Sequence, residues 1–122
     1  MNFAQRAVSP RSPAHGLVLA QRIKDYLQES YTQKITLESL ALEMGVSVSQ
    51  IKRTFREQIG QSMVNYITNL RISQAKRMIR EGDLNFTQIA ETVGYDSIYY
   101  FSSLFKKNTG KTLSEYARSL KD

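Results

Sequence analysis

The sequence predicts an all-α fold. Apolar residues recur at intervals of three and four from Leu17 to the end of the chain, which is the spacing of amphipathic helices. Both prolines, Pro10 and Pro13, precede this region, so no proline interrupts it. Glycine or a residue with a capping side chain separates the successive apolar segments. Together these observations predict about seven helices.

The expected helices follow one another with short connections. In chain order they cover residues 17–31, 37–44, 48–58, 63–80, 86–93, 98–107 and 113–120. Five are preceded by a side chain that can accept a hydrogen bond from the first turn, namely Thr36, Ser47, Ser62, Asn85 and Thr112. Three would end in a left-handed glycine, at Gly60, Gly82 and Gly110. Residues 1–16 have no apolar periodicity and are expected to form a flexible tail or an interdomain linker.

The inward faces of these helices define the expected core. Its large apolar members are Leu40, Phe55, Ile89, Phe101 and Phe105. Tyr66 and Tyr116 are expected to be core or capping residues. His15 lies in the predicted tail, with no partner in view.

The composition excludes several classes of protein. A length of 122 residues corresponds to one domain or to two very small ones. The chain has no cysteine and one histidine, which excludes a disulfide framework and a thiolate metal site and argues against a catalytic triad. It also lacks a glycine-rich phosphate loop and an apolar run of the roughly 18 residues that a membrane helix needs. We therefore expect a cytoplasmic protein that is not an enzyme, has no cofactor, binds no metal and contacts no membrane.

The charge of the chain is positive but spread out. Lys and Arg number 17 against 11 Asp and Glu, which gives a formal net charge of +6. This surplus suggests an anionic partner, although many soluble domains are mildly basic. No single basic run accounts for it, so the position of the cations on the predicted helices matters more than their number.

An internal repeat is the most informative pattern in the sequence. Residues 37–47 match residues 86–96 at an offset of 49, and beyond one inserted residue the offset becomes 50. Each copy has a helix, a tight turn with a glycine and a second helix, which is the helix-turn-helix pattern. Gly45 permits the positive φ of the first turn, and Ala41 and Ala90 are small because the two helices of each copy cross closely.

The outward face of the second helix carries positive charge in both copies. With Ile51 and Phe55 inward, at about 100° per residue, the first copy presents Ser49, Arg53 and Arg56, flanked by Gln50 and Lys52. The second copy presents Tyr99, Ser103 and Lys106, flanked by Tyr100, Ser102 and Lys107. The helix that precedes each of them carries only acidic residues among its charged side chains. Cations thus gather on the two elements that a helix-turn-helix places against DNA.

These residues divide into expected base contacts and expected phosphate contacts. Arg53 is the leading base reader, because a guanidinium can pair with O6 and N7 of guanine. Ser49 and Gln50 follow it, although Gln50 has the alternative task of capping the helix at Ser47. In the second copy the base-reading candidates are Tyr99 and Ser103. The expected phosphate contacts are Lys52, Arg56, Ser102, Lys106 and Lys107.

The later part of the chain resembles a known family. Residues 94–116 closely resemble the C-terminal signature of the AraC/XylS family of bacterial transcription regulators, and residues 67–79, with Arg71 and Ala75, resemble its linking helix. The resemblance covers about residues 17–118. It implies two homeodomain-like helix-turn-helix subdomains joined by a long linking helix. Their expected bounds are 17–62 for the first subdomain, 63–81 for the linking helix and 82–122 for the second subdomain.

The resemblance also implies a function, which is sequence-specific binding of double-stranded DNA to control transcription. A linking helix of roughly 25 Å could hold two recognition helices in adjacent major grooves, about one DNA turn apart. RNA polymerase is a further implied partner, and the family commonly couples this module to an N-terminal sensing domain. The alternative is a helical adaptor that binds protein and contacts no nucleic acid.

Three positions depart from the family pattern. Members often have an arginine at the position of Ser103, a serine at that of Tyr99 and a proline at that of Leu113. Without that arginine, the second recognition helix lacks a bidentate reader of guanine. Base discrimination is therefore expected to rest mainly on the first copy, with Tyr99 making a methyl or phosphate contact.

Overall fold

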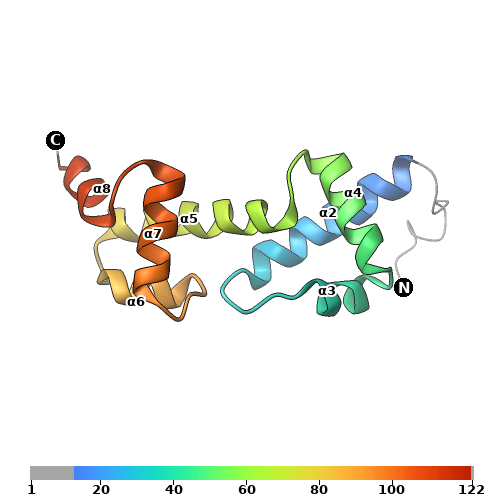
Figure 1. Ribbon diagram of the computed structural model, residues 1–122, viewed down its shortest axis with the longest axis horizontal. Helices are drawn as coiled ribbons and strands as arrows, with labels where there is room; N and C mark the ends of the chain where they lie inside the picture. The colour runs from blue at the N-terminus through green and yellow to red at the C-terminus, as the bar shows by residue number, and fades with distance from the viewer. Residues whose placement is uncertain (1–12, 122) are drawn as a thin grey trace. The chain divides into compact units, whose positions relative to one another are not determined.

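The structure is a computed structural model that describes residues 13–121. Its elements are α2 (Pro13–Ser30), α3 (Leu37–Met44), α4 (Val48–Ile59), α5 (Met63–Glu81), α6 (Phe86–Thr92), α7 (Ile98–Thr109) and α8 (Leu113–Ser119) (Figure 1). No strand occurs between residues 13 and 121, and the predicted all-α fold is confirmed. Within the same range, no helix combines the length and the apolar character that crossing a lipid bilayer requires.

The first helix begins earlier than the sequence predicted. α2 starts at Pro13 and not at Leu17, whereas the bounds of the other helices differ from the expected ones by at most two residues. Proline fits the first position of a helix, because its missing N–H would have no partner there and its fixed φ is helical. The predicted tail is therefore wrong for residues 13–16, and its remaining part lies outside the described residues.

Contacts divide the chain into two compact units. The first contains α2, α3, α4 and the start of α5, as far as Ile67. The second contains the rest of α5 with α6, α7 and α8, together with Tyr31–Lys34 from the loop between α2 and α3. The division between the units falls within α5, after Ile67, and not at the ends of this helix.

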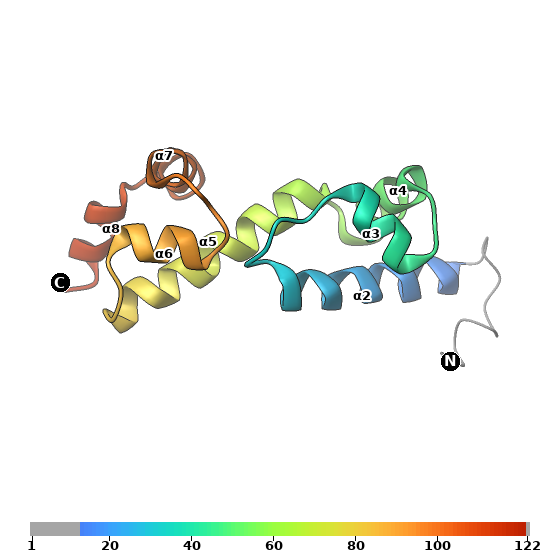
Figure 2. The same ribbon diagram turned by 90° about the horizontal axis from the view of Figure 1, so that it is seen from below.

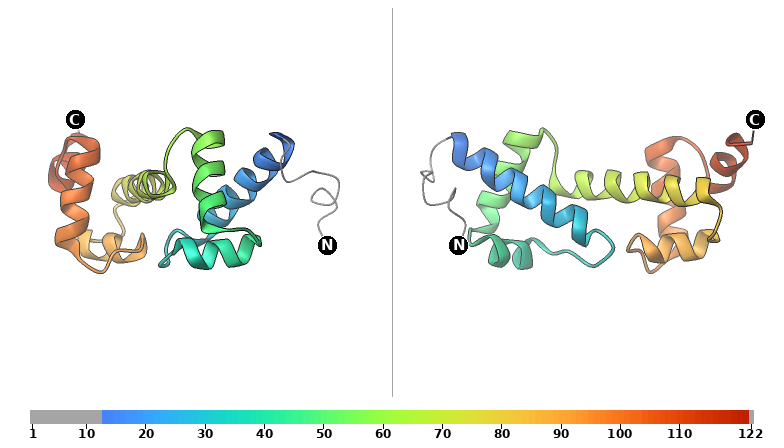
Figure 3. Two further views of the ribbon diagram at one scale, coloured as in Figure 1. Left: turned by 45° about the vertical axis from the view of Figure 1, so that its right-hand side comes forward. Right: turned by 180° about the vertical axis from the view of Figure 1, so that it is seen from behind.

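In the first unit, α2 packs against both helices of the first helix-turn-helix (Figure 3). Its buried residues Leu19, Ile23 and Leu27 share a core with α3 and α4. The members from those two helices are Leu40, Ala41, Met44, Ile51 and Phe55. The ring of Phe55 also meets Tyr66 edge-on, with 5.3 Å between the ring centroids.

In the second unit, the buried face of α5 takes part in the core of the second helix-turn-helix. Ile72, Ala75 and Met78 of α5 share this core with residues of α6, α7 and α8 and with the C-cap of α6; these are Ile89, Ala90, Val93, Phe101, Phe105 and Leu113. Phe105 meets Tyr116 edge-on at 5.7 Å, which repeats the contact between Phe55 and Tyr66. In Figure 2, α7 is seen almost end-on beside α6 and α8.

The predicted core, the five predicted N-caps and the three predicted glycine ends are confirmed. The five large core residues are fully buried, and Tyr66 and Tyr116 are half-buried against them. Each predicted N-cap accepts a hydrogen bond from the backbone three residues later; the caps are Thr36, Ser47, Ser62, Asn85 and Thr112. The three glycines predicted at helix ends have positive φ angles.

Candidate nucleic-acid interface

The two helix-turn-helix copies close their turns with the same hydrogen bond. In the first, the Val46 N–H donates to the Ala41 carbonyl at 3.1 Å, and in the second the Tyr95 N–H donates to the Ala90 carbonyl at 2.9 Å. The residue before each donor is a glycine, with φ +72° at Gly45 and +103° in the second copy. A left-handed glycine followed by this closure is the Schellman ending of a helix. The repeat found in the sequence is therefore a repeat of backbone geometry.

The copies differ by one residue inside the turn. Ser47 caps α4 by accepting a hydrogen bond from the Gln50 N–H at 3.1 Å. In the second copy Asp96 is inserted, and Ser97 caps α7 by accepting from the Tyr100 N–H at 3.2 Å. Sequence reasoning missed Ser97 as a cap because the first part of the repeat pairs Ser47 with Asp96; the change of offset was the signal that located the extra residue.

The exposed face of α4 is basic. Ile51, Thr54 and Phe55 are buried, and the side chains of Ser49, Lys52, Arg53 and Arg56 are exposed. This confirms the orientation predicted for the helix, in which cations face outward and apolar residues face the core. The contact of these four residues with DNA remains a prediction.

Gln50 lies at the edge of the exposed face of α4 and is half-buried. Its side-chain amide Nε2 lies 3.4 Å from Nε2 of His15, which belongs to α2. The expectation that His15 sits in a tail without a partner is therefore wrong. Because α2 begins at Pro13, it brings the imidazole beside the first turn of α4, so Gln50 has a neighbour that neither of its two predicted tasks anticipated.

The exposed face of α7 changes character along the helix. Tyr99 is 84% exposed and Tyr100 is 60% exposed, and both lie in the first turn. Ser103 is exposed one turn later, and Lys106 and Lys107 are exposed in the last turn. The aromatic rings thus stand at the end of α7 that follows the helix-turn-helix turn, and the cations stand at the other end.

A cavity of about 590 Å³ gathers four of the predicted residues of α7. Ser102, Ser103, Lys106 and Lys107 line it together with Phe86 of α6 and residues at the start of α8. Ser102 is half-buried, whereas Ser103, Lys106 and Lys107 are exposed. The arrangement offers hydroxyl and ammonium donors around an apolar floor.

Arg71 of α5 has a structural role that sequence reasoning did not assign. Its side chain is buried, with an exposed fraction of 9%, and it donates from Nε to the Tyr31 carbonyl and from Nη2 to the Gln33 carbonyl, both at 2.8 Å. The guanidinium carbon lies 4.9 Å from the centre of the Tyr95 ring. Arg71 therefore fixes the loop after α2 and the turn before α7 to the same helix.

The close packing at Arg71 explains a second requirement for glycine at position 94. A Cβ on Gly94 would lie 3.0 Å from the Arg71 guanidinium and 3.0 Å from the Tyr31 carbonyl oxygen.

The sequence contains one signal that Arg71 is buried. Arg71 lies among the apolar residues of α5, next to Ile72 and one turn before Ala75. An arginine on an inward face is buried only when its donors are satisfied.

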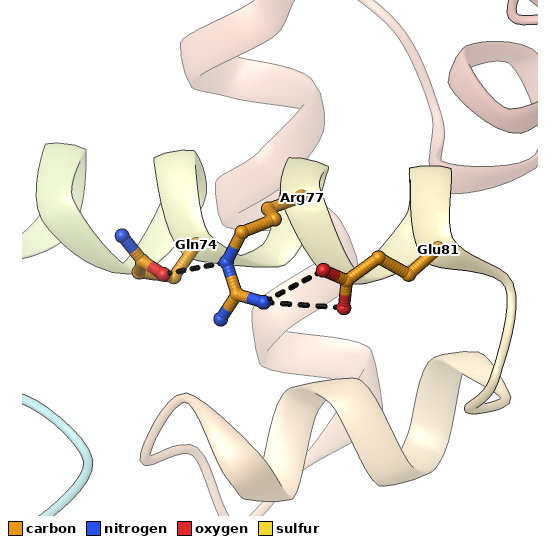
Figure 4. Close-up of polar contacts among 3 residues, drawn as sticks. All are labelled: Gln74, Arg77 and Glu81. Carbon is orange, nitrogen blue, oxygen red and sulfur yellow. Dashed lines mark hydrogen bonds and ion pairs between the residues drawn. The ribbon is translucent and has the colours of Figure 1, made fainter.

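The ion pair described between residues 13 and 121 joins two residues of α5 and involves no residue of α4 or α7. It joins Arg77 to Glu81 on α5 at 3.0 Å, and Arg77 also donates to Gln74 (Figure 4). Within that range, no carboxylate forms an ion pair with the cations of α4 or α7. The side chains of these cations are exposed. No group of three or more potential metal-ligating residues gathers in the described part of the chain.

Comparisons with known proteins agree with this geometry. Residues 40–119 match the helix-turn-helix domain family. The chain is 34% identical to the uncharacterized HTH-type transcriptional regulator YdiP of Escherichia coli, over 86% of this chain and 35% of that protein. It is also 34% identical to the arabinose operon regulatory protein of E. coli, over 79% of this chain and 32% of that protein. The chain thus spans about a third of the length of these relatives.

Solved structures share the fold. The C-terminal domain of AraT, a response regulator from Geobacillus stearothermophilus, superposes with a TM-score of 0.81 at 33% identity, over 91% of this chain and 88% of that domain. The DNA-binding domain of AdpA in complex with a target DNA superposes with a TM-score of 0.78 at 20% identity, over 84% of this chain and 92% of that chain. The chain therefore belongs to the helix-turn-helix domain family, and its resemblance to the DNA-binding domains of AraC-type transcription regulators is confirmed.

Proposed function

We propose that this chain binds specific sequences of double-stranded DNA to control transcription, with α4 and α7 as recognition helices. One observation carries the proposal: the same turn is built twice, and each time the helix that follows it exposes cations outside any described ion pair. Cations on a recognition helix neutralise phosphates and release counterions, which supplies much of the affinity for DNA. The adaptor alternative offers no reason for this charge to recur.

The side chains on the two helices have different tasks in this proposal. Arg53 reads a guanine, and Ser49 and Gln50 contact neighbouring base edges. Tyr99 and Ser103 face the bases of the second site. The phosphate contacts come from Lys52, Arg56, Ser102, Lys106 and Lys107.

We also propose a wider setting, which the greater length of the relatives supports. We assign residues 13–62 and 82–122, which precede and follow the linking helix 63–81 in the chain, as two DNA-binding subdomains that act in the cytoplasm. An N-terminal sensing domain would supply the signal, and RNA polymerase would be the protein partner on DNA. We assign no catalytic role, although one relative, AdaA of Bacillus subtilis, is named a bifunctional transcriptional activator and DNA repair enzyme; it is 35% identical over 47% of its length.

Selection of bound sequences from random duplexes, followed by footprinting, tests the proposal. We expect two protected half-sites about ten base pairs apart, one for each recognition helix. A salt titration of the selected duplex should show affinity that falls steeply as salt rises, because counterions are released. No enrichment of any sequence, or duplex binding that is insensitive to salt, would favour the adaptor. Protection of a single short site would contradict the use of both helices.

A further inference from the structure

Two adjacent exposed tyrosines open the recognition helix of the second unit. Tyr99 and Tyr100 keep 84% and 60% of their surface exposed. The other large apolar residues exposed among the described residues are aliphatic, and no two of them are adjacent in the chain. Single exposed aliphatic residues are ordinary on protein surfaces, whereas neighbouring aromatic rings leave a substantial apolar surface in water.

The ring of Tyr100 rests on a packed support. It lies 5.7 Å from the ring of Tyr95, which in turn stacks on Phe101 with 5.4 Å between centroids and 28° between planes. Phe101 is fully buried, and the Arg71 guanidinium lies over Tyr95. A ring held in this way has little freedom left to lose when it contacts a ligand, so its apolar surface favours binding at a small entropic cost.

The position of the tyrosines on α7 indicates which part of DNA they meet. The first residues of a recognition helix contact base edges, and Tyr99 and Tyr100 occupy the first turn. Lys106 and Lys107 lie two turns further on, where phosphates would be met. Ser103, between these groups, has a short side chain and cannot supply the bidentate contact that an arginine makes with guanine.

The major groove offers one apolar group to such rings, which is the C5-methyl of thymine. We infer that Tyr99 and Tyr100 form a contact surface for thymine methyl groups, so that the second unit selects T·A base pairs by apolar contact. The inference rests on the proposed function, since it requires α7 to enter the major groove. A contact with a methyl group requires the tyrosine rings and not their hydroxyl groups, whereas a contact with phosphate requires the hydroxyl groups.

Replacing thymine by deoxyuridine removes only that methyl group and therefore tests the inference. Each thymine of the selected duplex is replaced in turn, and affinity is measured for the wild type and for Tyr99→Ala, Tyr100→Ala and Tyr99→Phe. We expect at least one thymine whose replacement weakens wild-type binding about fourfold, the change that burial of one carbon group produces. The same replacement should lose its effect in Tyr99→Ala or in Tyr100→Ala, according to which ring meets that methyl group, and should keep its full effect in Tyr99→Phe.

Leu42→Ala is the matched control, because Leu42 is 86% exposed on α3, outside both recognition helices, and should leave the response to deoxyuridine unchanged. Circular dichroism verifies that Tyr100→Ala keeps its helices. If that variant does not fold, the Tyr99 variants still test the inference, because the exposed Tyr99 side chain has almost no packing to lose. The inference is overturned if no deoxyuridine weakens specific binding, or if Tyr99→Phe loses as much affinity as Tyr99→Ala. Absence of any preferred duplex would instead overturn the proposed function.

Discussion

The two helix-turn-helix units share a backbone and differ in the chemistry that they expose. Both close the turn onto an alanine carbonyl, and both place a phenylalanine against a tyrosine edge-on. The first then exposes Arg53 and Arg56, whereas the second exposes tyrosines before a serine and two lysines. The buried positions of the repeat thus build the same scaffold twice, while the exposed positions differ, and in the proposed function this difference gives each unit its own preference for DNA.

In the second unit, Arg71 supports the turn before α7 through the Tyr95 ring, and Arg71→Ala should have the largest effect of the substitutions considered. We expect the free energy of unfolding of the second unit to fall by about 3 kcal/mol, because two hydrogen bonds from a charged donor are lost and two carbonyl groups lose their partner. Chemical denaturation followed by circular dichroism measures the change. Arg77→Ala is the control on the same helix, since its exposed ion pair should contribute at most about 1 kcal/mol. If the two substitutions lowered the free energy of unfolding equally, the structural role assigned to Arg71 would be contradicted.

Arg53→Ala tests the assignment of guanine reading to the first unit. The free energy of specific binding should weaken by about 1 to 3 kcal/mol, and one base position should become tolerant of substitution. Competition among duplexes that vary one base at a time measures both effects. If the base preference stays intact while affinity falls for all sequences alike, Arg53 contacts phosphate, and the contrast between the units lies elsewhere.

Lys106→Ala tests the assignment of phosphate contact to the far end of α7. Binding should weaken by the same factor for all duplexes, and the slope of affinity against salt should become shallower by about one counterion. Arg77→Ala changes the net charge equally but removes a cation that Glu81 already holds, so its slope should remain that of the wild type. A change in base preference without a change in slope would show that Lys106 reads a base.

The smallest expected effect concerns helix capping in the second unit. The backbone N–H and side chain of Thr112 hydrogen-bond Glu115, and they hold the pKa of its carboxyl below the ordinary value. A lowered folded pKa means that this contribution to stability is present above the unfolded pKa and is lost as pH falls through the folded pKa. The melting temperature of the wild type should therefore decrease slightly as pH falls through the pKa of Glu115, and Glu115→Gln should remove this decrease. Glu38→Gln, at the start of α3, is the matched control, and an unchanged acid-side profile in Glu115→Gln would contradict the assignment.

Local rules account for what the sequence predicted well. Caps, glycine ends and apolar spacing depend on residues within one or two turns, so the helices from Leu37 onward were predicted to within two residues. The expected core residues followed from the same spacing. The outward orientation of Arg53 and Arg56 was predictable because the opposite side of α4 is apolar.

The features that the sequence did not predict depend on partners far along the chain. Gln50 meets His15, and Arg71 meets the carbonyls of Tyr31 and Gln33. Neither contact follows from helical spacing, because each joins side chains or backbone groups that only the folded chain brings together. The early start of α2 is not predicted for a different reason: proline is typical of flexible tails, but it also fits the first position of a helix.

The loop after α2 has a consequence for exchanging these modules between regulators. Tyr31–Lys34 belong to the second unit although they stand between two helices of the first, so the chain enters the second unit twice. If the second unit of another protein were joined after Ile67, the Tyr31 and Gln33 carbonyls of this chain would meet the corresponding residue of that protein in place of Arg71. To transfer the second unit intact, a chimera must carry both Tyr31–Lys34 and the segment that begins at Thr68. A chimera joined at a single position combines a loop and a helix from different proteins at this contact.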